Sequence, residues 1–206
     1  MTIRKGESWG EAVESPVGML VLPDDAALRA HVVAARQAGN DPAPVGVSGG
    51  NLARTMGGGG AHRFPGTVTR APVDIVRVEA GGDGAPAVTW AVSSVVVRGA
   101  RNRALLYAMN AQFLGEFDVA PRSHPNDGKI DVLVVDPSMT WRERRAAKRR
   151  ALTGTHVPHP KLTARQTAQS EASYTRPVTV WVDGVRWCEC RTLHLTVEPD
   201  ALTLHA

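Results

Sequence analysis

The chain has 206 residues, a hydrophobic fraction of 43% and a charged fraction of 21%. A chain of this size buries enough apolar surface for one large domain or two small ones, and its composition excludes an intrinsically disordered protein. Its apolar runs are much shorter than the ~20 residues that span a bilayer, and residues 1–18 lack the apolar core of a signal peptide. We therefore expect a globular protein in the cytoplasm.

The formal net charge of +4 is unevenly distributed. Residues 142–150 hold six basic residues and one acidic residue, so this segment alone, at +5, exceeds the charge of the whole chain. Such a run is either a solvated helix face or a surface that attracts anions.

The N-terminal part alternates strand and helix patterns. In chain order we expect a strand at 19–22, a helix at 26–38, a strand at 44–47, a loop at 48–51 and a helical turn that ends at 57–60. Asp24 or Asp25 is suited to cap the first helix. This order is typical of a piece of parallel sheet.

After about residue 65 the pattern changes to strands separated by turn residues. The expected strands are 73–79, 87–97, 105–112, 130–135, 178–182 and 193–197. One helix interrupts them at 138–152, with Ser138 or Thr140 as its cap, and it carries the basic run. The sequence thus predicts an α+β protein with a small α/β segment at 1–64 and a β-rich domain at 65–206.

Four segments of the β-rich part carry a family likeness. They are RSHPNDGKIDVLVV (Arg122–Val135), GTHVPHPKL (Gly154–Leu162), PVTVWVDGVRW (Pro177–Trp187) and LTVEPDALTL (Leu195–Leu204). In their order and spacing they resemble the C-terminal domain of the diacylglycerol-kinase-like lipid kinases, the superfamily of diacylglycerol and sphingosine kinases. The resemblance implies a β-rich, sandwich-like domain.

A second likeness concerns the nucleotide-binding part. VSGGNLARTMG (Val47–Gly57) is similar to the family's glycine-rich phosphate loop, but it is one residue shorter. The resemblance implies that Gly49, Gly50 and Asn51 contact the nucleotide together with Asp24, because backbone amides at a helix N-terminus bind phosphate. An ordinary strand-to-helix turn is the alternative.

Several departures from the family pattern affect the same chemistry. Leu22 and Pro23 replace the glycines of the family's Gly-Gly-Asp-Gly-Thr motif, and only about 18 residues precede this segment, where the family has a further strand, helix and strand. Val185 stands where the resemblance implies a glutamate that acts as general base, and a valine cannot accept a proton. The literal GGDGA at Gly81–Ala85 lies between two strand patterns, so we expect a hairpin tip there.

One turn is a candidate metal site. The resemblance implies a structural Mg²⁺ held by the Asp127 side chain and the carbonyls of His124 and Lys129, in the manner of hard cations that prefer oxygen ligands. The alternative is a type I turn in which Asp127 binds its own backbone. His156 with His159, and Cys188 with Cys190, lack the further ligands of a metal site, so packing roles are expected for both pairs.

Two classes of function follow from these observations. In the first, the chain is a degenerate lipid-kinase-family protein that binds a lipid, an anionic membrane surface, a partner chain or a second copy of itself. Arg142, Arg145, Lys148 and Arg149 would then hold it peripherally at the membrane. In the second it is an active ATP-dependent lipid kinase that phosphorylates a lipid hydroxyl. Nucleic-acid binding is a weaker third reading, because Trp141 is the one aromatic residue in the basic helix.

Overall fold

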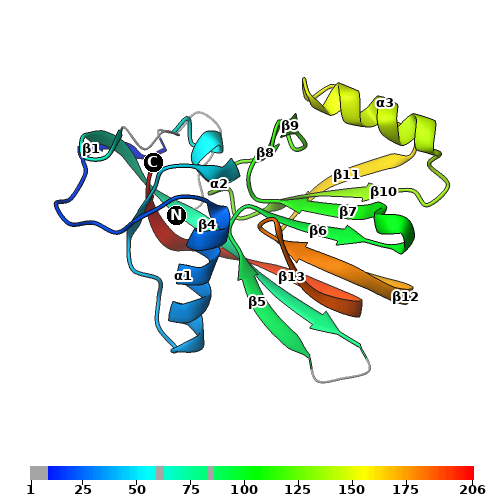
Figure 1. The fold of residues 1–206 in the computed structure, drawn as a ribbon, viewed down its shortest axis with the longest axis horizontal. Helices are drawn as coiled ribbons and strands as arrows, with labels where there is room; N and C mark the ends of the chain where they lie inside the picture. Colours follow the sequence, from blue (N-terminus) through cyan, green and yellow to red (C-terminus); the bar gives the residue numbers. More distant parts are fainter. Residues whose placement is uncertain (1–8, 59–62, 83–85) are drawn as a thin grey trace.

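The computed structural model describes residues 9–58, 63–82 and 86–206 (Figure 1). Its helices are α1 (Asp25–Gln37), α2 (Gly50–Thr55), α3 (Trp141–Ala151) and a short 3-10 helix at Ala100–Asn102. Its strands are β1 (Glu11–Glu14), β2 (Val21–Leu22), β3 (Val45–Val47), β4 (Thr67–Gly81), β5 (Ala87–Ala91), β6 (Ser94–Arg98), β7 (Ala104–Met109), β8 (Phe113–Leu114), β9 (Phe117–Asp118), β10 (Ile130–Val135), β11 (Leu162–Thr167), β12 (Gln169–Val182) and β13 (Val185–His205).

Most strands belong to one long, bent sheet. Its order is β1-β4-β13-β12-β6-β7-β10-β11, all antiparallel, and β5 pairs with β4. The parallel strands β2 and β3 join it where β3 pairs with the end of β13. The strands β8 and β9 form a separate hairpin. The predicted α+β class, with a β-rich sandwich-like domain, is confirmed.

Strand β13 connects two hydrophobic cores. Leu193 and Leu195 pack into the core of the β-rich part, whereas Leu202 and Leu204 pack into a second core with the N-terminal segment. The register of β13 against β4 shifts between Glu198 and Leu202, and Asp200 has a φ of 54° there. This irregularity lets one strand serve both cores.

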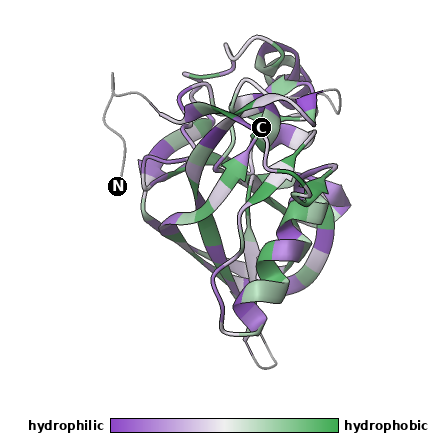
Figure 2. Cartoon of the chain, turned by 90° about the vertical axis from the view of Figure 1, so that its left-hand side faces the viewer, coloured by the Kyte–Doolittle hydropathy of each residue, from purple (hydrophilic) through white to green (hydrophobic). Residues whose placement is uncertain are grey.

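The second core explains why α1 forms where it does. Leu28 and Val32, four residues apart, bury one face of α1, and α2 adds Leu52. Burial of each such side chain contributes about 1.5–3 kcal/mol to stability. Figure 2 shows apolar and hydrophilic residues interspersed along the strands and helices, as expected where one face of each element is buried.

Several strand predictions differ from the structure, among them the following three. The expected strand at 87–97 is two strands, β5 and β6, because the buried Asp183 carboxylate accepts hydrogen bonds from the backbone in the gap between them. The edge strand β11 was not expected, because LTARQT lacks an apolar alternation. Strand β12 begins at Gln169, well before the expected start at residue 178.

The division at residue 64 stays a prediction. Residues 59–62, at the expected boundary, and residues 83–85, in the GGDGA segment, lie outside the described residues. Val45 of β3 pairs with Leu204 of β13, so the N-terminal segment and the β-rich part share a sheet.

Asp183 is expected to be a major contributor to stability. Its carboxylate accepts the amides of Val92, Ser93 and Ser94 at 2.8–2.9 Å, and it also accepts the Ser93 hydroxyl. In Asp183→Asn, the side-chain amide would face the Val92 amide, and a buried donor left without an acceptor costs about 1–3 kcal/mol. Chemical denaturation should show this loss at pH 7, whereas the exposed Glu189→Gln should stay within about 0.5 kcal/mol of the parent.

The pH dependence of this loss tests the same carboxylate. Burial raises the pKa of Asp183 from 3.8 to about 6, against the lowering effect of its hydrogen bonds. Between these values the folded state holds the proton more tightly, so the parent's unfolding free energy falls as the pH rises. The difference in unfolding free energy between the parent and Asp183→Asn should therefore become smaller as the pH rises from about 3.8 to about 6. A difference that grows with rising pH would contradict the raised pKa of Asp183.

Candidate functional site

The glycine-rich loop is packed against the chain's own backbone. It follows β3 and leads into α2, as expected for a phosphate loop. A Cβ on Gly49 would come within 2.6 Å of the Pro23 carbonyl oxygen. Gly50 has a φ of 94°, and a Cβ there would collide with the Asp25 carboxylate. Both glycines are therefore required by contacts within the protein.

The amides at the start of α2 already have an anionic partner. Asp25 is buried, and its two carboxylate oxygens accept the Asn51 amide at 2.8 Å and the Leu52 amide at 3.1 Å. Burial raises the pKa of Asp25, and these hydrogen bonds act in the opposite direction. The carboxylate thus occupies the position that a phosphate oxygen takes at such a helix N-terminus.

The other residues expected at a nucleotide also have internal partners. The Asp24 carboxylate accepts the Ala27 amide at 2.9 Å and is the N-cap of α1. The side-chain oxygen of Asn51 accepts the Gly115 amide at 2.7 Å, which fastens the β8–β9 hairpin to α2. The structure therefore brings Asp24, Gly49, Gly50 and Asn51 into one region, but each has a structural role there.

Val185 lies at the start of β13, in the turn after β12, and its side chain is 43% exposed. The neighbouring acid, Asp183, is buried, and its pKa is also raised by the charge of Asp25. The β12–β13 turn therefore brings the Asp183 carboxylate into the neighbourhood of Asp25. Position 185 has no carboxylate, and the carboxylate of Asp183 already accepts hydrogen bonds from backbone amides.

The candidate metal turn contains mutually repelling carboxylates. Asp127 accepts the Lys129 amide at 3.0 Å, and burial raises the pKa of Asp127. Burial raises the pKa values of Asp74 and Asp131, and the charge of Asp127 raises both further. The pKa of Asp74 is raised to about 6. The His124 ring accepts the Asn126 amide through Nδ1.

These residues fit a hard cation. Mg²⁺ is usually held by one or two carboxylates with further oxygen ligands, and a cation at Asp127 would relieve the repulsion among the three acids. Across residues 9–58, 63–82 and 86–206, no group of three His, Cys, Asp or Glu side chains is arranged as a metal site. The family resemblance supplies the carbonyls of His124 and Lys129 as further ligands, and on this basis we propose the Mg²⁺ as a structural ion. The hydrogen bond from the Lys129 amide to Asp127 is also what the alternative, a turn in which Asp127 binds its own backbone, predicts.

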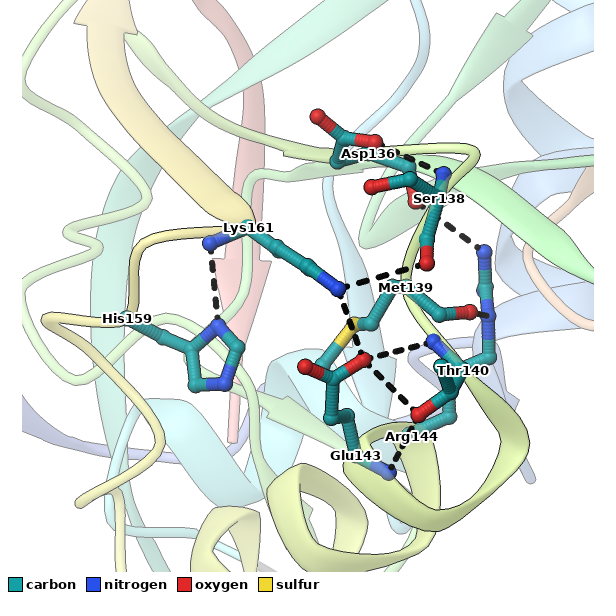
Figure 3. Close-up of polar contacts among 8 residues, drawn as sticks. All are labelled: Asp136, Ser138, Met139, Thr140, Glu143, Arg144, His159 and Lys161. Carbon is teal, nitrogen blue, oxygen red and sulfur yellow. Dashed lines mark hydrogen bonds and ion pairs between the residues drawn. The ribbon is translucent and has the colours of Figure 1, made fainter.

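Helix α3 begins in a dense polar network (Figure 3). Thr140 and Glu143 form a capping box, with Glu143 accepting the Thr140 amide at 2.7 Å. Lys161 reaches from the following loop to Glu143 at 2.9 Å and to the Ser138 carbonyl at 3.3 Å. The hydrogen bond from Thr140 and the Lys161 ammonium lower the pKa of Glu143 to about 2. The N-terminus of α3 is thus firmly fixed to the sheet.

The outer face of α3 combines cations with exposed apolar side chains. Trp141, Arg145, Arg149 and Leu152 follow the helical repeat along one face, and Trp141 and Leu152 are 64% and 49% exposed. The Arg145 guanidinium lies 5.6 Å from the Trp141 ring centroid. Arg142 and Lys148 are also exposed, and the Lys148 ammonium lies 4.8 Å from the Phe117 ring centroid.

Sequence reasoning missed three buried aspartates, Asp25, Asp74 and Asp183. Each accepts backbone amides from a segment far away in the chain, at distances of 2.7–3.1 Å. A signal was present for Asp74, an acid within the apolar run VDIV, because a charge inside a buried strand needs partners. For Asp25, the local sequence indicates only an alternative cap to Asp24.

Fold and site together define a β-sandwich-like domain joined to a small α/β segment that carries a glycine-rich loop. The chain belongs to the family described as the YegS C-terminal NAD kinase beta sandwich-like domain, whose pattern matches residues 77–206. The resemblance to diacylglycerol-kinase-like lipid kinases is confirmed at the level of the family. No curated protein matches the sequence.

Three solved structures from Bacillus anthracis str. Sterne, whose descriptions name a diacylglycerol kinase, share the fold. Their sequence identities are 11%, 10% and 10%, with TM-scores of 0.51, 0.53 and 0.52. Each match covers 79% of this chain and 66%, 69% and 68% of the respective solved chain. This chain thus spans about two thirds of their length.

The Mg²⁺ site predicts a stabilisation by the metal alone. A ligand that binds only the folded state adds RT ln(1 + [L]/Kd) to its stability, so the melting temperature should rise with Mg²⁺ concentration. The rise should disappear in Asp127→Ala and persist in Asp41→Ala, which removes an exposed aspartate elsewhere. A parent whose melting temperature ignores Mg²⁺ would rule the site out.

Proposed function

We propose that this protein is a lipid-kinase-family member that no longer transfers phosphate and that docks reversibly on anionic lipid surfaces through α3. The observation that carries the first part is the pair of hydrogen bonds from the Asn51 and Leu52 amides to Asp25. A phosphate-binding loop needs free amides. Here a carboxylate of the chain itself takes them, and it would repel a phosphate.

The position of the family's general base supports the same conclusion. Val185 offers no proton acceptor, and loss of a positioned general base typically lowers the rate 10²–10⁴-fold. Pro23 adds a steric reason, because its carbonyl oxygen packs against Gly49 so closely that a Cβ there would lie 2.6 Å away, and it covers that side of the loop. The two defects are independent, so repair of one should not restore phosphate transfer.

This independence gives a direct test. The parent and Val185→Glu should both fail to phosphorylate diacylglycerol or sphingosine with radiolabelled ATP and Mg²⁺, because the loop amides stay bound to Asp25 in each. An active lipid kinase in the same assay is the positive control. Turnover by the parent that is lost in Asp24→Ala would establish the alternative, an active ATP-dependent lipid kinase.

The second part of the proposal rests on the outer face of α3. Each basic residue near an anionic membrane contributes about 1 kcal/mol of attraction. Tryptophan favours the interface between headgroups and acyl chains, which suits the exposed Trp141 beside Arg145. No described helix is both long and apolar enough to cross a bilayer. The attraction is sufficient for transient docking at the surface.

Vesicle binding should depend on charge and on this face. The parent should co-sediment with phosphatidylglycerol vesicles but not with phosphatidylcholine vesicles, and binding should fade from 0.1 M to 1 M salt as the Debye length falls from ~10 Å to ~3 Å. A triple replacement of Arg142, Arg145 and Arg149 by glutamate should abolish sedimentation.

The control carries the same change in charge elsewhere. Arg70, Arg176 and Arg186 are exposed and lie outside α3, so their replacement by glutamate should leave most of the vesicle binding intact. If the two triple variants lose vesicle binding equally, binding depends on the net charge of the protein and not on α3. If the parent ignores lipid but retards a DNA fragment at the same salt concentration, the nucleic-acid reading replaces docking on membranes.

A further inference from the structure

Two cysteine side chains lie next to each other on strand β13. Cys188 and Cys190 occupy alternate positions of the strand, so both point to the same face, toward the core of the β-rich part. Cys190 is 3% exposed, whereas Cys188 is half-buried, and both are free thiols. The two thiols are within hydrogen-bonding distance of each other. They therefore form a pair of sulfur ligands in one place.

The strand geometry disfavours a disulfide within this pair. Residues of a strand rise about 3.2–3.4 Å each, so alternate residues on one face are about 6.4–6.8 Å apart. A disulfide needs Cβ atoms about 3.5–4.5 Å apart, and β13 would have to bend to form one. Cys188 pairs with Val180 and Cys190 with Val178 of β12, which keeps the strand extended here. The two sulfurs therefore remain separate ligands.

The set of ligands selects the kind of ion. Structural Zn²⁺ takes four ligands, and within the part of the chain that the structure describes no third His, Cys, Asp or Glu side chain completes such a site. Hard cations such as Mg²⁺ and Ca²⁺ need oxygen ligands, whereas Tyr174 and Trp187 pack against the same core as the thiols. Two thiolates alone suit Cu(I), a soft monovalent ion that prefers sulfur.

Both thiols are protonated at neutral pH in the absence of a metal. Burial raises the pKa of Cys190 to about 11, and the neighbouring Cys188 adds to this effect. Burial also raises the pKa of Cys188, where Glu189 acts in the same direction and Arg186 in the opposite one. A metal ion deprotonates the thiols that it binds. The complex of two thiolates with Cu(I) carries one negative charge, and Arg186 lies near enough to compensate it in part.

We propose that Cys188 and Cys190 bind one Cu(I) ion as a two-coordinate site. Two S–H bonds break and two S–Cu bonds form, so two protons leave for each ion bound, and the copper stays Cu(I). The half-buried Cys188 gives the ion access from solvent, while Cys190 holds it at the edge of the core. The packing role expected from the sequence concerned ions that need three or four ligands. The site is independent of the proposed docking on membranes, whose residues lie on α3.

Titration of the reduced parent with Cu(I), supplied as its acetonitrile complex in the absence of oxygen, tests the site. Competition against the chelator bicinchoninate should show one ion per chain, with a thiolate-to-copper charge-transfer absorption in the near ultraviolet. Because two protons leave with each ion bound, the affinity should rise about 100-fold per pH unit near neutral pH. No binding, one ion shared between two chains, or a rise of only about tenfold per pH unit would each overturn the proposal.

Variants locate the site. Cys188→Ser and Cys190→Ser should each lower the affinity for Cu(I) at least 100-fold, because one thiolate remains. The control His194→Gln, which removes another metal-ligating side chain from β13, should bind Cu(I) like the parent. The count of released protons uses the parent alone, so it keeps the test decisive if Cys190→Ser, which puts a hydroxyl in the core, does not fold. Unchanged affinity in Cys188→Ser, or displacement of the Cu(I) by an equal concentration of Zn²⁺, would overturn the two-coordinate site.

Discussion

Strand β13 is the element on which the rest of the structure depends, because its 21 residues pair with β12, β4 and β3. A strand this long could not serve two cores without a break in its register, and the break falls between Glu198 and Leu202. The carboxylate of Asp74 accepts the Asp200 amide at this point, at 3.0 Å, and the Gly128 amide at 2.7 Å. The irregularity of the central strand and the candidate metal turn are thus fixed by one buried acid.

Two buried aspartates, one in each part of the chain, bind backbone amides that lie far away in the sequence. Asp25 binds the amides of α2, and Asp183 binds the backbone between β5 and β6. Both sites would otherwise leave buried amides without acceptors, at a cost of about 1–3 kcal/mol each. The glycine-rich loop is therefore held by the chain itself, because the carboxylate of Asp25 satisfies the donors at the start of α2.

Helix α3 differs from the other helices because the fold fixes its start more firmly than its body. The capping box and Lys161 hold its first turn, whereas Ala151 is its one buried residue. A helix with so little buried surface leaves a cavity beneath it and exposes Trp141 and Leu152 above. The same weak packing leaves the outer face of α3 accessible for the proposed docking on membranes.

The sequence by itself determined the family, the α+β class and the position of the basic helix, because motif order, strand patterns and charge runs are local features. Strand β10 lies at the expected residues, Ile130–Val135. The sequence could not separate Asp24 from Asp25, since both satisfy the local rule for a helix cap. Only the tertiary structure decided that Asp25 turns inward to the amides of α2, 26 and 27 residues away. It also decided that Arg144 faces a cavity while Arg145 faces solvent, because this depends on which side of α3 meets the sheet.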